Sequence, residues 1–99
     1  MERLNEAELS EILNEIDTFC SQDFNLILHN DNVNYMEDVV VVLYEVCRLP
    51  NERCVKVMME AHHKGKGLIT TGEINTLLDL MLELKKRGLT TSIEPSKQS

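Results

Sequence analysis

A short polar turn between two apolar segments is the part of this sequence best suited to bind a ligand. Residues 26–28 are apolar and predict a buried strand, whereas Met36 begins an apolar helical pattern. Four small side chains with oxygen acceptors separate them: Asn30, Asp31, Asn32 and Asn34. Asn and Asp hydrogen-bond their own backbone and tolerate tight-turn dihedrals, so this run predicts a turn. Because Asp31 is anionic and apolar residues adjoin the turn, it suits a ligand with a small cation beside an apolar group.

The residue types that usually carry catalysis or bind metals are present, but their spacing suits neither task. His62 and His63 are adjacent, so on a helix they point about 100° apart and do not fit one compact metal site. The sequence has no Cys-x-x-Cys and no His-Glu-x-x-His pattern. Residues 64–67, Lys-Gly-Lys-Gly, lack the preceding strand and the glycine spacing of a phosphate loop. We therefore expect no catalytic residues, no metal and no cofactor, in a protein that is not an enzyme.

Charge and cysteine content narrow the classes of partner. The 99 residues, enough for one domain, include 17 acidic and 10 basic side chains, for a net charge of −7. Such a chain repels phosphate groups, which argues against nucleic acid and anionic membranes as partners. The cysteines are odd in number, and Cys47 and Cys54 lie on apolar helical faces, which predicts reduced structural thiols in the cytoplasm. No apolar run reaches transmembrane length, and the acidic N-terminus is unlike a signal peptide.

The first 22 residues form a segment separate from the rest of the pattern. Apolar residues from Leu9 to Phe19 are spaced to fall on one face of a helix. This segment is either a helix docked on the main domain or a mobile arm that becomes ordered on a partner. We therefore divide the chain into an arm at 1–22, a core domain at 23–95 and a tail at 96–99.

The first half of the core domain predicts a strand and two helices. Residues 24–29 predict the strand. Four consecutive β-branched residues at 39–42 favour a strand by propensity, but the apolar spacing from Met36 to Cys47 predicts a helix over about 35–48. Asn34 and Glu37 are spaced as a capping box at its start. Pro50 predicts the start of a second helix, which extends to about His63 and is ended by Gly65 and Gly67.

The second half predicts a strand, a helix and a last strand. Residues 68–70 form a short strand, and Thr70 and Glu73 are spaced as the capping box of a third helix. Lys85, Lys86 and Arg87 suit the C-terminal end of that helix, and Gly88 predicts its stop. Residues 89–93 alternate and predict the last strand. The order β-α-α-β-α-β indicates an α+β domain whose helices cover one face of a sheet.

Several pieces of this sequence, in order, resemble the ClpS adaptor family. They are Asn30-Asp31-Asn32, Met36-Glu37, the run from Met58 through His62-x-x-Gly65-Lys66-Gly67, and Glu73. The likeness covers about residues 24–95. The family has an Asn-Asp-(Asp) turn after its first strand, a Met-Glu at the start of its first helix and an His-x-x-Gly-x-(Gly or Ala) exit from its second.

The resemblance implies a small α/β sandwich, with a three-stranded antiparallel sheet packed against three helices, and an adaptor function. ClpS proteins are not enzymes. They bind N-degron proteins, whose first residue has a free α-amine and a large hydrophobic side chain (Leu, Phe, Tyr or Trp). They deliver these proteins to a Clp AAA+ unfoldase of the ClpA or ClpC type for degradation.

The resemblance also implies roles for individual residues. Asn30, Asp31 and His62 would hold the α-ammonium group. The hydrophobic pocket would be lined by five residues: Met36, which would act as its gate, Val39, Met58, Ala61 and Leu89. Glu73 would contact the unfoldase.

This chain departs from the family pattern in the turn and after Glu73. Asn32 replaces the second aspartate of the turn, and Asn34-Tyr35 replaces the usual Thr-Pro before the gate methionine. Leu77 and Leu78 stand where a basic residue is expected. An alternative hypothesis is a structural protein–protein interaction domain of the same fold, without specificity for a first residue. That alternative would gain support if the N-terminal helix packed over the pocket.

Overall fold

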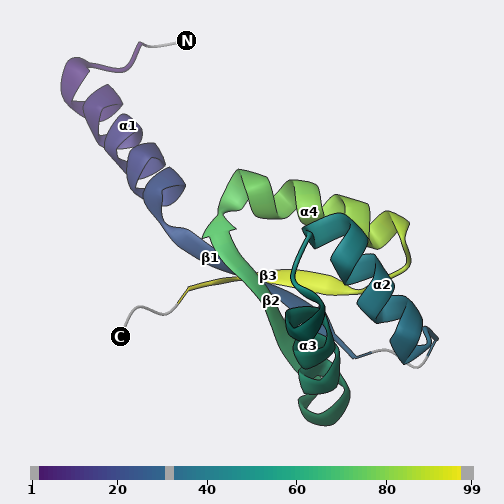
Figure 1. Cartoon of the computed structure of the whole chain (residues 1–99). Coiled ribbons are helices and arrows are strands. Elements are labelled where there is room, and N and C mark those ends of the chain that lie inside the picture. The colour runs from purple at the N-terminus through teal and green to yellow at the C-terminus, as the bar shows by residue number, and fades with distance from the viewer. Residues whose placement is uncertain (1–2, 31–32, 97–99) are drawn as a thin grey trace.

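The computed structural model of this chain describes residues 3–30 and 33–96, without the side chains of residues 14–21. After a helix α1 at Glu6–Ser21, the chain forms strands β1 (Asp23–His29), β2 (Lys66–Glu73) and β3 (Thr91–Pro95) and helices α2 (Met36–Cys47), α3 (Asn51–Lys64) and α4 (Ile74–Lys86). The predicted order β-α-α-β-α-β after an N-terminal segment is confirmed, and so is the α+β class (Figure 1).

The three strands form one antiparallel sheet with β1 at its centre, in the order β2-β1-β3. The core lies between the sheet and the three helices that follow β1. Its buried members are Phe24, Leu26, Leu28, Val42, Leu43, Cys54, Val57, Ala61, Ile69, Leu77, Leu84 and Leu89. Phe24, Leu26 and Leu28 alternate along β1, as one face of a strand requires. All three helices of the core domain therefore cover the same face of the sheet.

The opposite face of the sheet is covered by polar pairs that link the strands. Thr71 donates to Asn25 at 2.7 Å between side-chain oxygens, and Lys66 forms a salt bridge with Glu94 at 2.9 Å. Lys66 pairs with His29, Glu94 pairs with Asn25, and Ile27 lies between these two positions of β1. The salt bridge therefore crosses over Ile27, which explains why this apolar side chain is buried on the face without helices.

Helix α2 forms where periodicity, and not β propensity, predicted it. Val42 and Leu43 are buried, so the valine run supplies the packed face of a helix. The predicted capping box of Asn34 and Glu37 is wrong, because the N-cap is Tyr35, which makes no side-chain cap hydrogen bond. The Asn34 amide instead donates to the Gly88 carbonyl at 2.8 Å, a contact 54 residues away that local spacing does not reveal.

Strand β2 is longer than predicted and changes how α4 begins. Thr70 pairs with Leu26, and the strand continues to Glu73, which pairs with Asp23. Thr70 and Glu73 therefore form no capping box, and Glu73 precedes α4 without a side-chain cap. Pairing with the full length of β1 extends β2 beyond the residues that look strand-like alone. The last strand is likewise shifted two residues towards the C-terminus from the predicted 89–93, because Leu89 is buried in the core.

Two glycines have structural requirements at the end of α3. Gly65 adopts the left-handed conformation with φ 86°, and its N–H donates to Ala61 at 2.9 Å, which ends the helix as predicted. Gly67 lies so close to α3 that an added Cβ would stand 2.5 Å from the Val57 carbonyl oxygen. The absence of a side chain at Gly67 therefore allows β2 to pack directly against α3.

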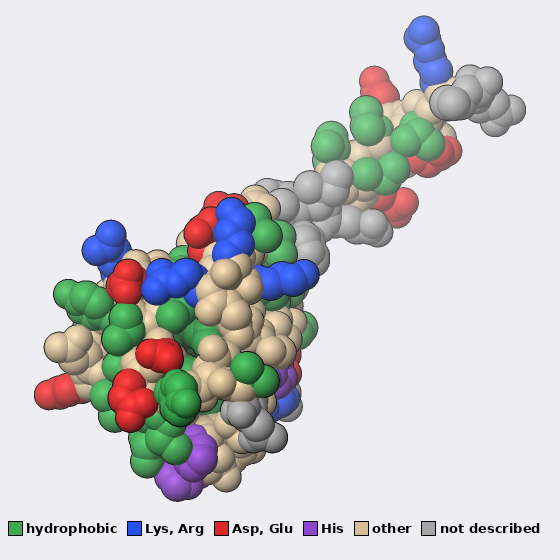
Figure 2. Space-filling view, turned by 90° about the vertical axis from the view of Figure 1, so that its right-hand side faces the viewer, with side chains coloured by type: hydrophobic (Ala, Val, Ile, Leu, Met, Phe, Trp, Pro, Cys, Tyr) green, Lys and Arg blue, Asp and Glu red, His purple; other side chains and the backbone are tan. Residues whose placement is uncertain are grey.

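Helix α1 extends away from the core domain (Figure 1). The radius of gyration is 17.3 Å, whereas a compact chain of this length has about 13 Å. Asn5 caps this helix: its side-chain oxygen accepts the Glu8 N–H at 2.8 Å, and its amide donates to the Glu8 carboxylate at 2.8 Å. Figure 2 shows hydrophobic and acidic side chains side by side on the projecting helix. The division of the chain at residue 22 stays a prediction.

Candidate functional site

A pocket of about 240 Å³ opens between the end of β1 and the helices α2 and α3. Its described lining consists of Leu28, His29, Asn30, Asn34, Met36, Val39, Met58, Ala61 and His62. The volume lies below the roughly 300–1,000 Å³ of pockets for drug-sized molecules, so the pocket suits a single large side chain. Six of the eight residues predicted for the site line this one cavity: Asn30, His62, Met36, Val39, Met58 and Ala61.

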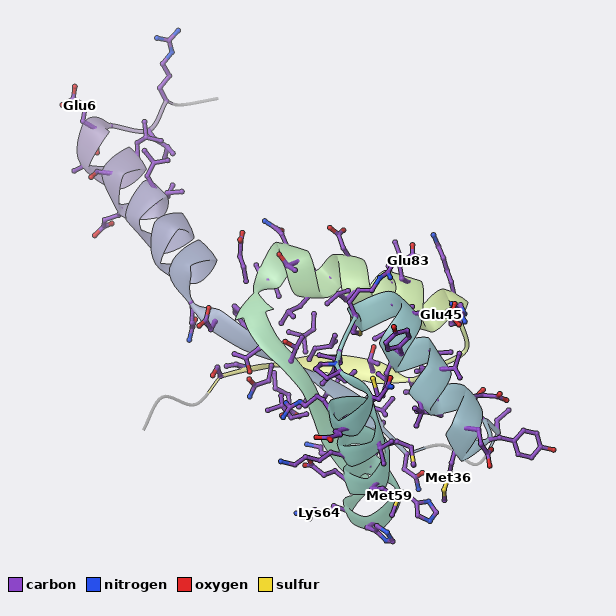
Figure 3. The ribbon with its side chains drawn as sticks, in the orientation of Figure 1. Glu6, Met36, Glu45, Met59, Lys64 and Glu83 are labelled. Carbon is purple, nitrogen blue, oxygen red and sulfur yellow. The ribbon has the colours of Figure 1, made fainter. Side chains whose placement is uncertain are left out.

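The two helices present their pocket residues through ordinary helical spacing. Met58, Ala61 and His62 are three and four residues apart and share one face of α3. Met36 is the first residue of α2, and Val39 follows one turn later. In Figure 3, Met36 and Met59 lie at the same end of the molecule, where α2 begins and α3 ends. The pocket therefore lies at the junction of two helix termini and the end of the central strand.

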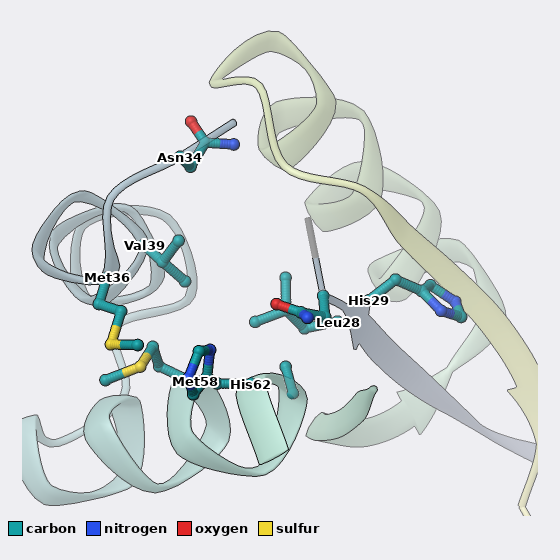
Figure 4. Close-up of a pocket in the computed structure, with 9 residues that line it drawn as sticks. Leu28, His29, Asn34, Met36, Val39, Met58 and His62 are labelled. Carbon is teal, nitrogen blue, oxygen red and sulfur yellow. The ribbon is translucent and has the colours of Figure 1, made fainter. Parts of the chain in front are cut away.

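The walls of the pocket are apolar, and their side chains become more exposed from the interior to the entrance. Leu28 and Ala61 are buried, Val39 and Met58 are half-buried, and Met36 is exposed at the entrance. The side chains of Met36 and Met58 point towards one another across the gap between the helices (Figure 4). A thioether is flexible and polarizable, so this pair can adapt to apolar groups of different shape. Burial of one Leu or Phe side chain here is worth roughly 1.5–3 kcal/mol.

The polar groups of the pocket lie at its entrance, where the strand becomes a turn. Backbone hydrogen bonds fix this position: His29 N–H donates to the Thr90 carbonyl at 2.9 Å, and Asn30 N–H donates to the Gly65 carbonyl at 3.0 Å. These bonds connect the end of β1 to the segment just before β3 on one side and to the end of α3 on the other. The side chains of Asn30 and His62 are exposed and accessible to a ligand.

The two polar residues Asn34 and His29 reach the pocket in ways that the sequence did not indicate. The amide of Asn34 is held by Gly88, while the residue itself lines the cavity. The ring of His29 points away towards β3 (Figure 4), and its Nε2 lies 2.6 Å from the hydroxyl of Ser92. Asn34 therefore belongs to the described wall, whereas the imidazole of His29 is engaged on the other side of the strand.

The other three predicted site residues are not among the described residues of this lining. Asp31 falls, with Asn32, outside the described residues. Leu89 is buried and lines a second hollow beside Asn34, together with Asp38, Val41, Val42 and Arg87. Glu73 is exposed at the end of β2 opposite Asp23, so it lies at the other end of the sheet from His29 and the pocket. The functional roles of all nine residues, the eight of the pocket and Glu73, stay predictions.

Sequence reasoning missed Leu28 and Asn34 for different reasons. Leu28 is on the same face of β1 as Leu26, so the alternation of the strand could have placed it towards the helices. Asn34 was interpreted as a helix cap, and only its contact with the distant Gly88 reveals its position. No carboxylate occurs among the described residues of the pocket lining, so any anion at this entrance has to come from another position.

The two thiols that the structure describes, Cys47 and Cys54, are poorly suited to nucleophilic chemistry. Burial raises the pKa of the Cys47 thiol to about 11, with a further contribution from neighbouring Cys54, whose own pKa is raised by burial. Such thiols stay protonated and are poor nucleophiles. Across residues 3–30 and 33–96, no three His, Cys, Asp or Glu side chains are grouped to hold a metal ion. No helix within the same described ranges is long and apolar enough to cross a membrane.

Residues 20–92 match the family described as ATP-dependent Clp protease adaptor protein ClpS. Among curated relatives, the ClpS of Synechococcus elongatus is 44% identical over 73 residues, which is 73% of this chain and 77% of that protein. The ClpS of Neisseria meningitidis serogroup A is 42% identical over 60 residues, 61% of this chain and 58% of the relative.

A solved structure shares the fold. It is Agrobacterium tumefaciens ClpS2 bound to L-phenylalaninamide, which superimposes with a TM-score of 0.66 at 27% identity and covers 76% of this chain and 98% of the other. L-phenylalaninamide combines a free α-amine with a large apolar side chain. Those are the two chemical groups that an apolar pocket with polar groups at its entrance can recognise.

Proposed function

The chain belongs to the ClpS family of ATP-dependent Clp protease adaptor proteins, which are not catalytic, and we propose that its pocket binds the first residue of N-degron proteins. The ligand is a free α-amine followed by a large hydrophobic side chain, that of Leu, Phe, Tyr or Trp. The bound protein is then delivered to a Clp AAA+ unfoldase. A cytoplasmic location, where such unfoldases work, belongs to the same proposal.

The observation that carries this proposal is the composition of one small cavity. Its inner walls are Leu28, Val39, Met58 and Ala61, and its entrance carries the polar groups of Asn30 and His62. An apolar side chain that enters leaves its own α-amine at the entrance. Agrobacterium tumefaciens ClpS2, which has this fold, was solved with a ligand of that chemistry.

The α-ammonium group needs acceptors and, for strong binding, a negative charge. It carries only donors, and Asn30 and a neutral His62 offer acceptor atoms. Asp31 follows Asn30 directly in the sequence and is the proposed anion. A charge-assisted hydrogen bond contributes roughly 1.5–3 kcal/mol. Micromolar affinity requires about 8 kcal/mol after the costs of association, so neither the apolar nor the polar half suffices alone.

The unfoldase contact is proposed for the other end of the sheet. Glu73 is exposed there, and the unfoldase would be of the ClpA or ClpC type. Because Glu73 pairs with Asp23 and the pocket adjoins His29, the two proposed contacts lie at opposite ends of β1. A substrate in the pocket would leave the region of Glu73 uncovered.

The alternative of a purely structural interaction domain receives no support from α1. That alternative would gain support if the N-terminal helix packed over the pocket. Helix α1 instead leads into Asp23, at the end of β1 opposite the pocket, and extends away from the core domain (Figure 1). The pocket entrance is consequently not covered by α1.

The experiment that tests the proposal is a peptide panel that varies the first residue, with each peptide in free and N-acetylated form. Fluorescence anisotropy with the full chain should show tight binding for Leu, Phe, Tyr and Trp and weak binding for Ser or Asp as the first residue. Acetylation removes the cation and should abolish binding of every member. Equal affinity for free and acetylated peptides would eliminate the ammonium site.

A further inference from the structure

The turn before α2 exposes two apolar side chains beside the pocket. Val33 is 88% exposed and Tyr35 is 76% exposed, whereas Asn34 between them is half-buried. The backbone of Tyr35 is extended, with φ −72° and ψ 148°. Residues 33 and 34 form a bend, in which Asn34 is partly buried while the side chains on either side of it are exposed.

The core domain holds this arrangement from both sides. Asn34 donates to the carbonyl of Gly88, a residue in the left-handed conformation with φ 87° that follows α4. On the other side, the carbonyl of Tyr35 accepts the Val39 N–H at 3.1 Å in the first turn of α2. Val33 and Tyr35 are thus presented from a turn that is fixed at the α4–β3 corner and at the start of a helix.

The chain neighbours of these two residues belong to the pocket. Asn34 lines the cavity, and Met36, the residue after Tyr35, lies at its entrance with 40% of its surface exposed. Isolated exposed apolar residues are common on protein surfaces, but a contiguous group beside a binding pocket indicates a contact surface. The sequence also leaves the ClpS pattern at this point, where Asn34-Tyr35 replaces Thr-Pro. A contact made here would distinguish this chain within its family.

The geometry of a bound residue directs the rest of the substrate towards this turn. The substituents of an α-carbon diverge by about 110°. If the amine contacts Asn30 and His62, beside the end of α3, and the side chain enters the cavity, the α2 side of the entrance is left for the carbonyl. That direction leads over the start of α2 and the turn before it. This step rests on the function proposed above.

We infer that Val33 and Tyr35 form a second subsite, which contacts the side chain of the substrate's second residue and prefers an apolar one. The Tyr35 ring supplies a large, stiff apolar surface with a polar tip, which suits contact at a wet entrance. The site contacts two consecutive residues of the substrate. It encloses the side chain of the first in the cavity and contacts the side chain of the second at the rim.

The test compares two peptides that differ only at the second residue, Phe-Leu and Phe-Ser, on the same polar tail. We expect the wild-type chain to prefer Phe-Leu by about fivefold, the effect of partly burying one aliphatic side chain. In Tyr35→Ser the preference should fall to about twofold or less, and Val33→Ser should reduce it by a smaller factor. Tyr44→Ser is the matched control, because Tyr44 is 50% exposed on α2 and does not line the pocket.

Three outcomes decide the inference. Equal wild-type affinity for the two peptides overturns it. A preference that survives in Tyr35→Ser but disappears in Met59→Ser also overturns it, because the substrate would then leave over α3. Acetylated peptides separate this inference from the proposed function: free-amine dependence without any effect of the second residue overturns only the subsite, whereas equal binding of acetylated forms overturns the proposed function itself.

Discussion

The two ends of the central strand β1 are built in opposite ways. At the His29 end, backbone hydrogen bonds connect the strand to Thr90 and Gly65, and the chain closes around a pocket. At the Asp23 end, the chain leads directly into α1, whose apolar residues Leu9 and Leu13 are exposed. One end is concave and fixed by the core, while the other projects from it.

This difference separates the part of the domain that can enclose a ligand from the part that projects from the core. A pocket that encloses one side chain needs a firm inner surface, and the fold supplies Leu28, Val39 and Ala61 where two helix termini and a strand end meet. A projecting helix needs no such walls, and its stability comes from its own cap and sequence. Changes at the His29 end should therefore alter folding or peptide binding, and changes at the α1 end should alter neither.

The largest expected effect comes from Gly67, beneath the pocket. Gly67→Ala would place a Cβ 2.5 Å from the Val57 carbonyl and 3.1 Å from the Ala61 amide nitrogen, both backbone atoms of α3. Because backbone cannot move aside cheaply, we expect a loss of about 1–3 kcal/mol or more in the free energy of unfolding, measured by urea denaturation. Gly72→Ala is the matched control, since its added Cβ meets no atom within 4 Å. Equal stability of the two variants would contradict the close packing of β2 on α3.

The next effect concerns the charge proposed for the entrance. Asp31→Asn keeps the size of the side chain and removes its negative charge, so affinity for a Phe peptide should fall about 10- to 100-fold, the worth of one charge-assisted hydrogen bond. Isothermal titration calorimetry measures this change. Asp38→Asn is the control, because Asp38 is an exposed carboxylate that lines the second hollow and not the pocket. A similar loss of affinity in both variants would indicate that the net charge of this region weakens binding, and that Asp31 is not a specific acceptor for the amine.

A smaller effect follows from the buried thiols between α2 and α3. The pKa of Cys47 is raised to about 11 in the folded chain, so the folded state retains a proton that the unfolded state releases from about pH 9 upward. Stability from this thiol is therefore complete below pH 9 and lost as the pH rises towards 11, by about 1 kcal/mol per pH unit. Urea denaturation at pH 7, 9 and 10.5 should show a steeper decline for the wild type than for Cys47→Ala. Parallel declines would mean that the thiol is not shielded from water.

The sequence predicted the elements that local periodicity determines. The apolar spacing from Met36 to Cys47 outweighed four β-branched residues, because burial of one helical face is worth more than their strand propensity. The same spacing placed Met58, Ala61 and His62 on one face of α3. The structure places all three residues in the lining of the pocket, and their roles in binding stay predictions.

The predictions from sequence were wrong where contacts between residues far apart in the chain determine the structure. Asn34 is not the N-cap of α2, a position held by Tyr35, and its amide donates instead to the carbonyl of Gly88, 54 residues later. Thr70 lies inside a strand because β1 pairs with it, although its spacing to Glu73 is that of a helix cap. Leu89 lies in the core and faces the second hollow, an orientation set by the corner between α4 and β3. Local patterns cannot contain this information, because each of these contacts closes a loop of many residues.

The smallest effect on the core domain should come from the cap of α1. Asn5→Ala removes the acceptor for the Glu8 N–H and should cost α1 about 1 kcal/mol, which frays its first turns. Far-UV circular dichroism should show a modest loss of helix, while the urea midpoint of the core and the affinity for a Phe peptide stay unchanged. Asn5→Asp keeps a capping oxygen and should restore the helical signal. A decrease in the urea midpoint of the core with Asn5→Ala would show that α1 stabilises the fold, and the contrast between the two ends of β1 would then be wrong.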